Sequence, residues 1–136
     1  MSKLLTHNGL RVSHSPYGGF GVFTDVPIKE GNIVEQCYVL IFEDKKIGEL
    51  PSLLQKYVYN WCDTNYVCTP LGFGMIYNHS NTPNTSIKCE YAIVEGEKKP
   101  ILTFTAIRDI EPGEEVLSYY GEDYFKHFNI KEYEWL

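Results

Sequence analysis

Frequent glycine, proline, asparagine and aspartate residues divide this chain into short apolar runs, and this division limits the folds that it can adopt. The runs are rich in β-branched and aromatic residues, which favour strands. We expect strands over residues 10–12, 22–23, 33–42, 66–69, 87–94, 101–107 and 116–119. A turn over residues 95–99 joins two of these runs as a hairpin. The sequence therefore predicts a mainly β protein.

One segment has helical spacing instead. Its apolar residues recur at i, i+3, i+4, i+7, i+8 and i+11, and they are Leu50, Leu53, Leu54, Tyr57, Val58 and Trp61. Pro51 stands where a helix can begin. A second short amphipathic helix is expected in the tail that starts at Glu122. We therefore expect one or two short helices beside the strands.

Two stretches, residues 23–34 and 104–116, resemble one another, and the second has one extra residue. Two copies are too few for a solenoid. They predict two similar strand–turn–strand units about a pseudo-twofold axis, and chance similarity is the alternative.

The size and charge of the chain limit its partners. A length of 136 residues predicts one domain. No apolar run approaches the roughly 20 residues of a membrane helix, and the start of the chain lacks a signal-peptide core, so we expect an intracellular protein without a membrane partner. A net charge of −6 argues against direct nucleic-acid binding, because phosphate binding needs clustered lysine and arginine. A basic peptide is a compatible partner.

The four cysteines are Cys37, Cys62, Cys68 and Cys89. They form neither a CxxC pair nor a cysteine–histidine cluster, so we expect no zinc or other metal site. Reduced, buried thiols are the expectation for all four.

Two segments have the composition of a ligand site. Asn78 and His79 lie in an apolar run, where both need partners if they are buried. About forty residues downstream, Tyr119 and Tyr120 precede a glycine. We expect the two segments to meet around a ligand. The structural alternatives are a capped turn, which Pro83 makes rigid, and an aromatic strand end.

A glycine-rich turn over residues 17–23 is a third candidate. Glycine lets the backbone approach a ligand closely. No lysine–serine pair follows it, so it does not match a phosphate loop, and a tight turn without a ligand is the alternative. Ser80 has no evident base, which argues against a hydrolytic triad.

The order of these motifs resembles that of SET-domain protein lysine methyltransferases, and most closely the small stand-alone SET proteins of large DNA viruses and bacteria. The similar stretches are Gly19-Phe20-Gly21-Val22-Phe23, Asn78-His79-Ser80 with Pro83-Asn84, and Gly113-Glu114-Glu115 through Tyr120-Gly121. The resemblance covers about residues 12–124. It implies a single SET domain over residues 1–136, in which the tail, residues 125–136, closes the substrate channel.

The resemblance also implies a fold and a cofactor. The fold is the mainly β, β-clip SET fold, with several small sheets around a C-terminal pseudoknot and one or two short helices. The cofactor is S-adenosylmethionine (AdoMet), the methyl donor, without a metal. By similarity, Gly19, Phe20 and Gly21 contact AdoMet through their backbone. Asn78 holds its amino-acid end, and His79 meets the adenine mainly through main-chain atoms.

By the same resemblance, Tyr120 is the catalytic tyrosine and also touches the cofactor. Tyr57 packs near the cofactor and the reacting centre and shares the catalytic role. Tyr119, Tyr124 and Ser118 belong to the substrate channel. Many relatives have phenylalanine or tyrosine at the position of Ser118, where it limits the number of methyl groups, so the product number stays open.

The implied function is that of an AdoMet-dependent protein lysine N-methyltransferase acting on a basic peptide such as a histone tail. A histone substrate would place the protein in a nucleus, including that of a host, and otherwise we expect it in the cytoplasm. The small relatives resemble dimers, so a homodimer is expected. The alternatives are a catalytically silent SET-like peptide-binding module and an unrelated β-rich ligand binder. Tyr120 together with Asn78 and His79 favours the enzyme, because a silent module need not keep all three.

Overall fold

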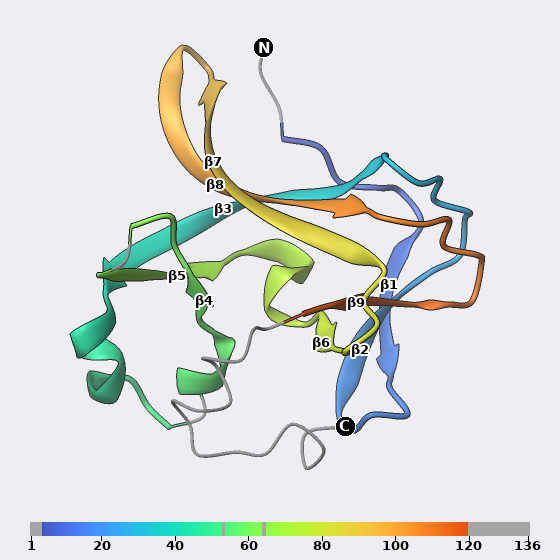
Figure 1. Cartoon of the computed structure of the whole chain (residues 1–136), viewed down its shortest axis with the longest axis horizontal. Helices are drawn as coiled ribbons and strands as arrows, with labels where there is room; N and C mark the ends of the chain where they lie inside the picture. Colours follow the sequence, from blue (N-terminus) through green and yellow to red (C-terminus); the bar gives the residue numbers. More distant parts are fainter. Residues whose placement is uncertain (1–3, 53, 64, 120–136) are drawn as a thin grey trace.

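The computed structural model describes residues 4–52, 54–63 and 65–119, and the structural statements below concern these residues. Two sheets form the molecule (Figure 1). The four-stranded sheet has the order β1 (Leu10–His14), β2 (Phe20–Thr24), β9 (Glu115–Ser118), β6 (Asn78–His79). The five-stranded sheet has the order β4 (Tyr59–Asn60), β5 (Tyr66–Pro70), β3 (Ile33–Glu43), β8 (Glu97–Ala106), β7 (Thr85–Val94).

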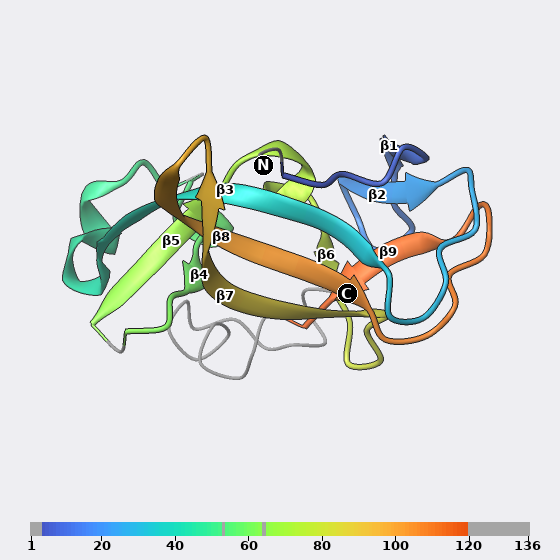
Figure 2. The same cartoon turned by 90° about the horizontal axis from the view of Figure 1, so that it is seen from above.

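Each of the seven predicted strands overlaps a strand of the structure, and the mainly β fold is confirmed. The hairpin of β7 and β8 pairs without interruption from Thr85 to Val94, and Figure 2 shows β3, β8 and β7 side by side. Glu95 and Gly96 close it with φ values of 53° and 78°. Two successive positive φ values are those of a two-residue type I′ turn, whose twist matches that of the strands. The turn is thus shorter than the predicted span of residues 95–99.

The helix predicted over residues 50–61 is wrong. In the described part of the chain there are three short 3-10 helices, η1 (Asp44–Glu49), η2 (Gln55–Tyr57) and η3 (Gly72–Met75), and one residue separates η2 from β4. The apolar residues at helical spacing serve two different clusters. Val58 packs with Ile47 and Val67, whereas Trp61 belongs to the main core. Pairing of β4 with β5 therefore overrides the local periodicity.

The two similar stretches pack against each other. Ile28 and Ile110, at equivalent positions, are fully buried and exchange backbone hydrogen bonds of 2.9 and 2.8 Å. Gly31 and Gly113 are also equivalent, both with φ of 89°, and each donates its N–H to the other stretch. The reciprocal contacts agree with the predicted pseudo-twofold arrangement.

The expectation of four reduced cysteines is wrong for two of them. Cys62, after β4, forms a disulfide with Cys89 on β7, with 5.9 Å between their Cα atoms. Their separation of 27 residues gave no sign of pairing, which depends on the connection between β4 and β5 folding toward β7. Cys37 and Cys68 are free and buried, as predicted. Burial raises the pKa of Cys68 to about 12, so this thiol stays protonated at neutral pH.

No helix in the described ranges combines the length and the apolar character that crossing a bilayer requires.

Replacing Cys62 with serine should lower the free energy of unfolding by about 3.5 kcal/mol, because the disulfide restricts a loop of this length in the unfolded chain. Denaturant unfolding without reductant measures the difference. Wild-type protein with its disulfide reduced is the control and should unfold like the variant. Equal stability of variant and oxidised wild type would show that the two cysteines are not linked in solution.

Candidate active site

The two segments expected to meet do so through a parallel strand pair. In β6 and β9, Asn78 lies opposite Leu117 and His79 opposite Ser118. The Ser80 N–H donates to the Ser118 carbonyl at 2.9 Å. The other edge of β9 pairs with β2, which follows the glycine-rich turn. One short strand therefore brings all three sequence motifs together. The predicted proximity of the Asn78-His79 segment and the strand that leads to Tyr119 is confirmed, and a ligand between them stays a prediction.

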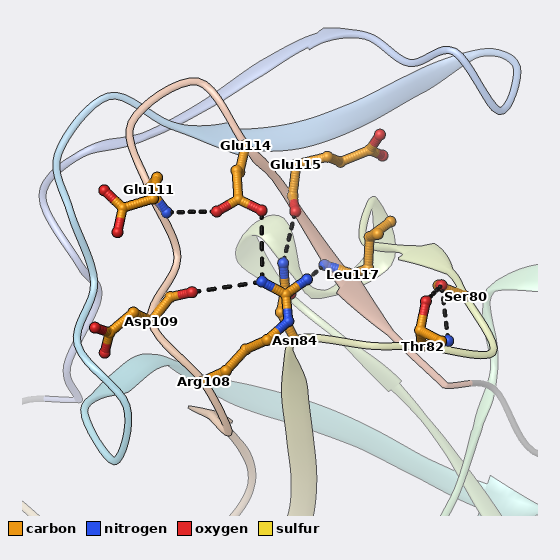
Figure 3. Close-up of polar contacts among 9 residues, drawn as sticks. All are labelled: Ser80, Thr82, Asn84, Arg108, Asp109, Glu111, Glu114, Glu115 and Leu117. Carbon is orange, nitrogen blue, oxygen red and sulfur yellow. Dashed lines mark hydrogen bonds and ion pairs between the residues drawn. The ribbon is translucent and has the colours of Figure 1, made fainter.

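Asn84 fixes β9 in place with its side chain (Figure 3). This residue is fully buried. Its Nδ2 donates to the Glu115 carbonyl at 2.8 Å, and its Oδ1 accepts from the Leu117 N–H at 2.8 Å. A side-chain amide can replace a strand neighbour because it offers the same donor and acceptor as a peptide group. The Asn84 side chain therefore supplies hydrogen-bond partners to backbone groups of β9 that the two-residue strand β6 does not pair with.

The buried carboxylate of Glu115 orients Asn78. Glu115 Oε2 accepts from Asn78 Nδ2 at 2.8 Å, and Glu115 Oε1 accepts from the Ser15 hydroxyl at 2.9 Å. Asn78 Nδ2 also donates to the Phe20 carbonyl at 3.1 Å. Both partners of the Asn78 amide are acceptors, so its nitrogen must face them. The Asn78 Oδ1 atom is left as the end of the side chain that can accept from a ligand.

Gly21 is required by space. A Cβ atom at this position would overlap Glu115 Oε2 and lie 3.0 Å from Asn78 Nδ2. Gly19 differs, because its surroundings are open and its φ is 64°. Gly21 lets the side chains of Glu115 and Asn78 approach the backbone, and Gly19 forms the turn.

A cavity of about 500 Å³ lies beside this network. Its size is in the range of sites for small molecules and cofactors. It is lined by Gly18, Gly19, Phe20, Tyr57, Gly72, Met75, Ile76 and Asn78. Four of these residues were predicted to bind the cofactor, namely Gly19, Phe20, Tyr57 and Asn78. The sequence reasoning did not assign Gly18, Gly72, Met75 and Ile76 to the site. Gly18 adjoins Gly19, and the other three precede Asn78 by two to six residues.

The other predicted site residues within the described ranges do not line the cavity. Gly21 lies behind it, next to Asn78. His79 is fully buried, and its ring lies 5.0 Å from the ring of Tyr119. Ser118 is fully buried too, and its hydroxyl has no hydrogen-bond partner among the described residues. Tyr120 and Tyr124 fall outside the described residues, as do the predicted tail helix and the end of the predicted pseudoknot.

Tyr119 lines a second hollow, of about 320 Å³. Tyr59 on β4 and Trp61, the residue after this strand, supply two further aromatic walls. The remaining lining residues are Asn60, Ile87, Cys89 and Leu102. The hollow thus combines several π faces with an apolar floor, a composition that suits an alkyl chain with a cationic end.

A second buried carboxylate, that of Glu35 on β3, lies near the cavity wall. It accepts hydrogen bonds from the Tyr77 hydroxyl at 2.6 Å and from the Phe73 N–H at 3.1 Å. Burial raises the pKa of Glu35, and these hydrogen bonds offset the increase only in part. Burial, with the Glu35 charge as the next cause, also raises the pKa of Tyr77 well above its ordinary value.

Comparison with known proteins assigns the fold. The SET domain family matches residues 19–121, and the chain belongs to this family. A crystal structure from Plasmodium falciparum, of a protein provisionally assigned as a histone methyltransferase, is similar. It is 31% identical, with a TM-score of 0.67, over 83% of this chain and 97% of that one. None of the curated proteins matches significantly.

Glu35→Gln should change how stability depends on pH. The folded-state pKa of Glu35 lies above the ordinary glutamate value of about 4.3, so its contribution to stability is present below that value and lost as the pH rises through the folded pKa. Glu35→Gln has no carboxyl group to ionise at this position, so its stability does not decrease for this reason as the pH rises. The thiol of Cys37 and the phenol of Tyr77, which face the carboxyl, also have raised pKa values and stay neutral in this range.

The free energy of unfolding of Glu35→Gln, relative to wild type, should therefore increase from about pH 4 to about pH 8. Denaturant unfolding across this range measures it. Glu43→Gln is the matched control, because Glu43 lies on the same strand with a side chain that is 42% exposed. A difference that stays constant with pH would contradict the raised pKa.

Proposed function

We propose that this protein is an AdoMet-dependent protein lysine N-methyltransferase. Membership of the SET domain family supports methyltransferase activity in general. The observation that carries the proposal is the orientation of Asn78, whose amide nitrogen is committed to Glu115 and Phe20. Its oxygen is thereby available to an N–H donor in a cavity of cofactor size. The α-ammonium group of AdoMet is such a donor.

The residues around the cavity fit the chemistry of AdoMet. Asn78 Oδ1 can accept a charge-assisted hydrogen bond from the ammonium group. A Cβ atom added at Gly19 would meet no other atom within 4 Å, so a ligand can approach the backbone closely on that side. The side chains of Met75, Ile76 and Phe20 offer apolar and aromatic surface to the remainder of AdoMet. Glu115 lies behind Asn78 and adds a negative charge that favours a cationic ligand.

When bound, AdoMet supplies the methyl group and the sulfonium leaving group, so the protein mainly aligns the reactants and excludes water. A solvated lysine has a pKa near 10.4 and is protonated at neutral pH. Aromatic side chains such as that of Tyr57 exclude water from the amine and thereby lower its pKa. A nearby positive charge also lowers the pKa of the amine. The site therefore needs no histidine base. The Tyr120 hydroxyl is proposed, on the motif alone, to accept from the amine and hold it in line.

For the substrate we propose a basic peptide such as a histone tail. The net charge of −6 favours a cationic partner. The hollow lined by Tyr59, Trp61 and Tyr119 is suited to a lysine side chain, because aromatic faces attract an ammonium group and its alkyl stem packs on them. A nuclear location would follow from a histone substrate.

Asn78→Ala should weaken AdoMet binding by about 10- to 100-fold, because it removes a hydrogen bond to a charged group. Isothermal titration calorimetry measures the dissociation constant. Asn81→Ala is the control, since Asn81 is an exposed residue of the same type that follows β6, three positions after Asn78. Undiminished affinity in Asn78→Ala would remove this residue from the binding site.

Tyr120→Phe should reduce methyl transfer by at least about 100-fold while AdoMet affinity changes little, because the hydroxyl acts on the reacting groups. Radiolabel transfer to mixed core histones, followed by mass spectrometry of the peptides, reports rate, site and methyl number. Tyr38→Phe is the control, because Tyr38 is an exposed tyrosine of β3 whose side chain lines neither the cavity nor the second hollow. Wild-type protein that binds AdoMet but methylates nothing would favour the silent module.

A further inference from the structure

One wall of the cavity is a single short segment, residues 72–78. It contains η3 and supplies four of the cavity-lining residues, Gly72, Met75, Ile76 and Asn78. A 3-10 turn of this length has little stability of its own. The contacts that residues 72–78 make on the side away from the cavity therefore determine the position of this wall.

Glu35 contacts the start of this segment. Its Oε2 accepts from the Phe73 N–H at 3.1 Å. A Cβ atom on Gly72 would lie 2.5 Å from the same oxygen, and the φ of Gly72 is 71°. Gly72 thus has the carboxylate on one side and the cavity on the other, with no side chain between them.

Glu35 also contacts the segment near its end. Its Oε1 accepts from the Tyr77 hydroxyl at 2.6 Å. The Tyr77 ring is fully buried and packs 4.7 Å from the Phe104 ring, so its position in the core is fixed. Between these two attachments the Tyr59 hydroxyl donates to the Gly74 carbonyl at 2.8 Å. The cavity-lining residues Met75 and Ile76 lie in this restrained stretch.

We propose that Glu35 is a positioning residue for the AdoMet cavity: its carboxylate holds both ends of the 72–77 segment and so sets the position of that wall. Glu35 does not line the cavity and takes no part in methyl transfer. The identity of the ligand, though not the restraint itself, rests on the proposed function.

A carboxylate suits this role because the two groups through which the segment contacts it are both donors. One oxygen serves the Phe73 N–H and the other serves the Tyr77 hydroxyl. Glutamine can reproduce both bonds, since its oxygen accepts from the N–H and its amide nitrogen donates to the phenol oxygen. Alanine leaves the N–H unpaired and opens space behind Gly72. The two variants therefore separate the geometry of the restraint from its charge.

The test compares Glu35→Ala and Glu35→Gln with Glu43→Ala, a control on the same strand whose carboxylate pairs with Lys45. Calorimetry gives the AdoMet dissociation constant, and steady-state kinetics give the KM for AdoMet and for peptide. Amide hydrogen exchange of the free protein reports on residues 72–77 without any ligand.

In Glu35→Ala we expect AdoMet affinity to fall about tenfold, which corresponds to about 1.4 kcal/mol. Its KM for AdoMet should rise while its KM for peptide does not, and faster exchange should be confined to residues 72–77. Glu35→Gln should stay within about twofold of wild type, because both hydrogen bonds are kept. Glu43→Ala should match wild type in every measurement.

Wild-type affinity and exchange in Glu35→Ala would overturn the proposal. So would faster exchange spread over both sheets with no rescue by glutamine, since that pattern describes general stability. If wild-type protein fails to bind AdoMet, the proposed function falls, and exchange at residues 72–77 still decides the role of Glu35. If Glu35→Ala does not fold, Tyr77→Phe removes one attachment and should weaken binding about threefold. No effect in that variant would also refute the proposal.

Discussion

The site depends on how β9, four residues long, is held between β2 and β6. Strand pairing alone is too short to fix it, because β6 has only two residues. The buried amide of Asn84 supplies the missing hydrogen bonds to the backbone of Glu115 and Leu117. This interaction sets where the Glu115 carboxylate lies, and Glu115 in turn orients Asn78. The glycine turn, the Asn-His segment and the strand that leads to the tyrosine pair are thereby placed by one side chain.

Two buried carboxylates stand behind different parts of the cavity wall. Glu115 accepts from Asn78 and Ser15, and Glu35 accepts from Phe73 and Tyr77. Burying a carboxylate costs free energy unless its oxygens are hydrogen-bonded, and here each oxygen has a donor. Such an arrangement adds little to stability and much to definition of position. Both charges also favour a cationic ligand over an anionic one.

Local sequence signals predicted the strands well because each run lies between strong turn residues, as at Glu95 and Gly96. They failed for residues 50–61, where the apolar spacing of a helix arises from two separate clusters around Val58 and Trp61. The Cys62–Cys89 disulfide was missed because it depends on which strands become neighbours. At the site, four of the predicted residues line the cavity, namely Gly19, Phe20, Tyr57 and Asn78, whereas Glu35 was not predicted. Its role is visible only once β3 is seen to lie behind residues 72–77.

The segment around Tyr57 contributes aromatic side chains to both hollows. Tyr57 lines the cavity beside Asn78, whereas Tyr59 and Trp61 line the hollow beside Tyr119. In an extended chain, residues two apart point to the same side, but here the 3-10 turn of η2 ends between Tyr57 and Tyr59 and redirects the chain. Under the proposed function, AdoMet would occupy the cavity beside Asn78, and the substrate lysine would occupy the hollow beside Tyr119.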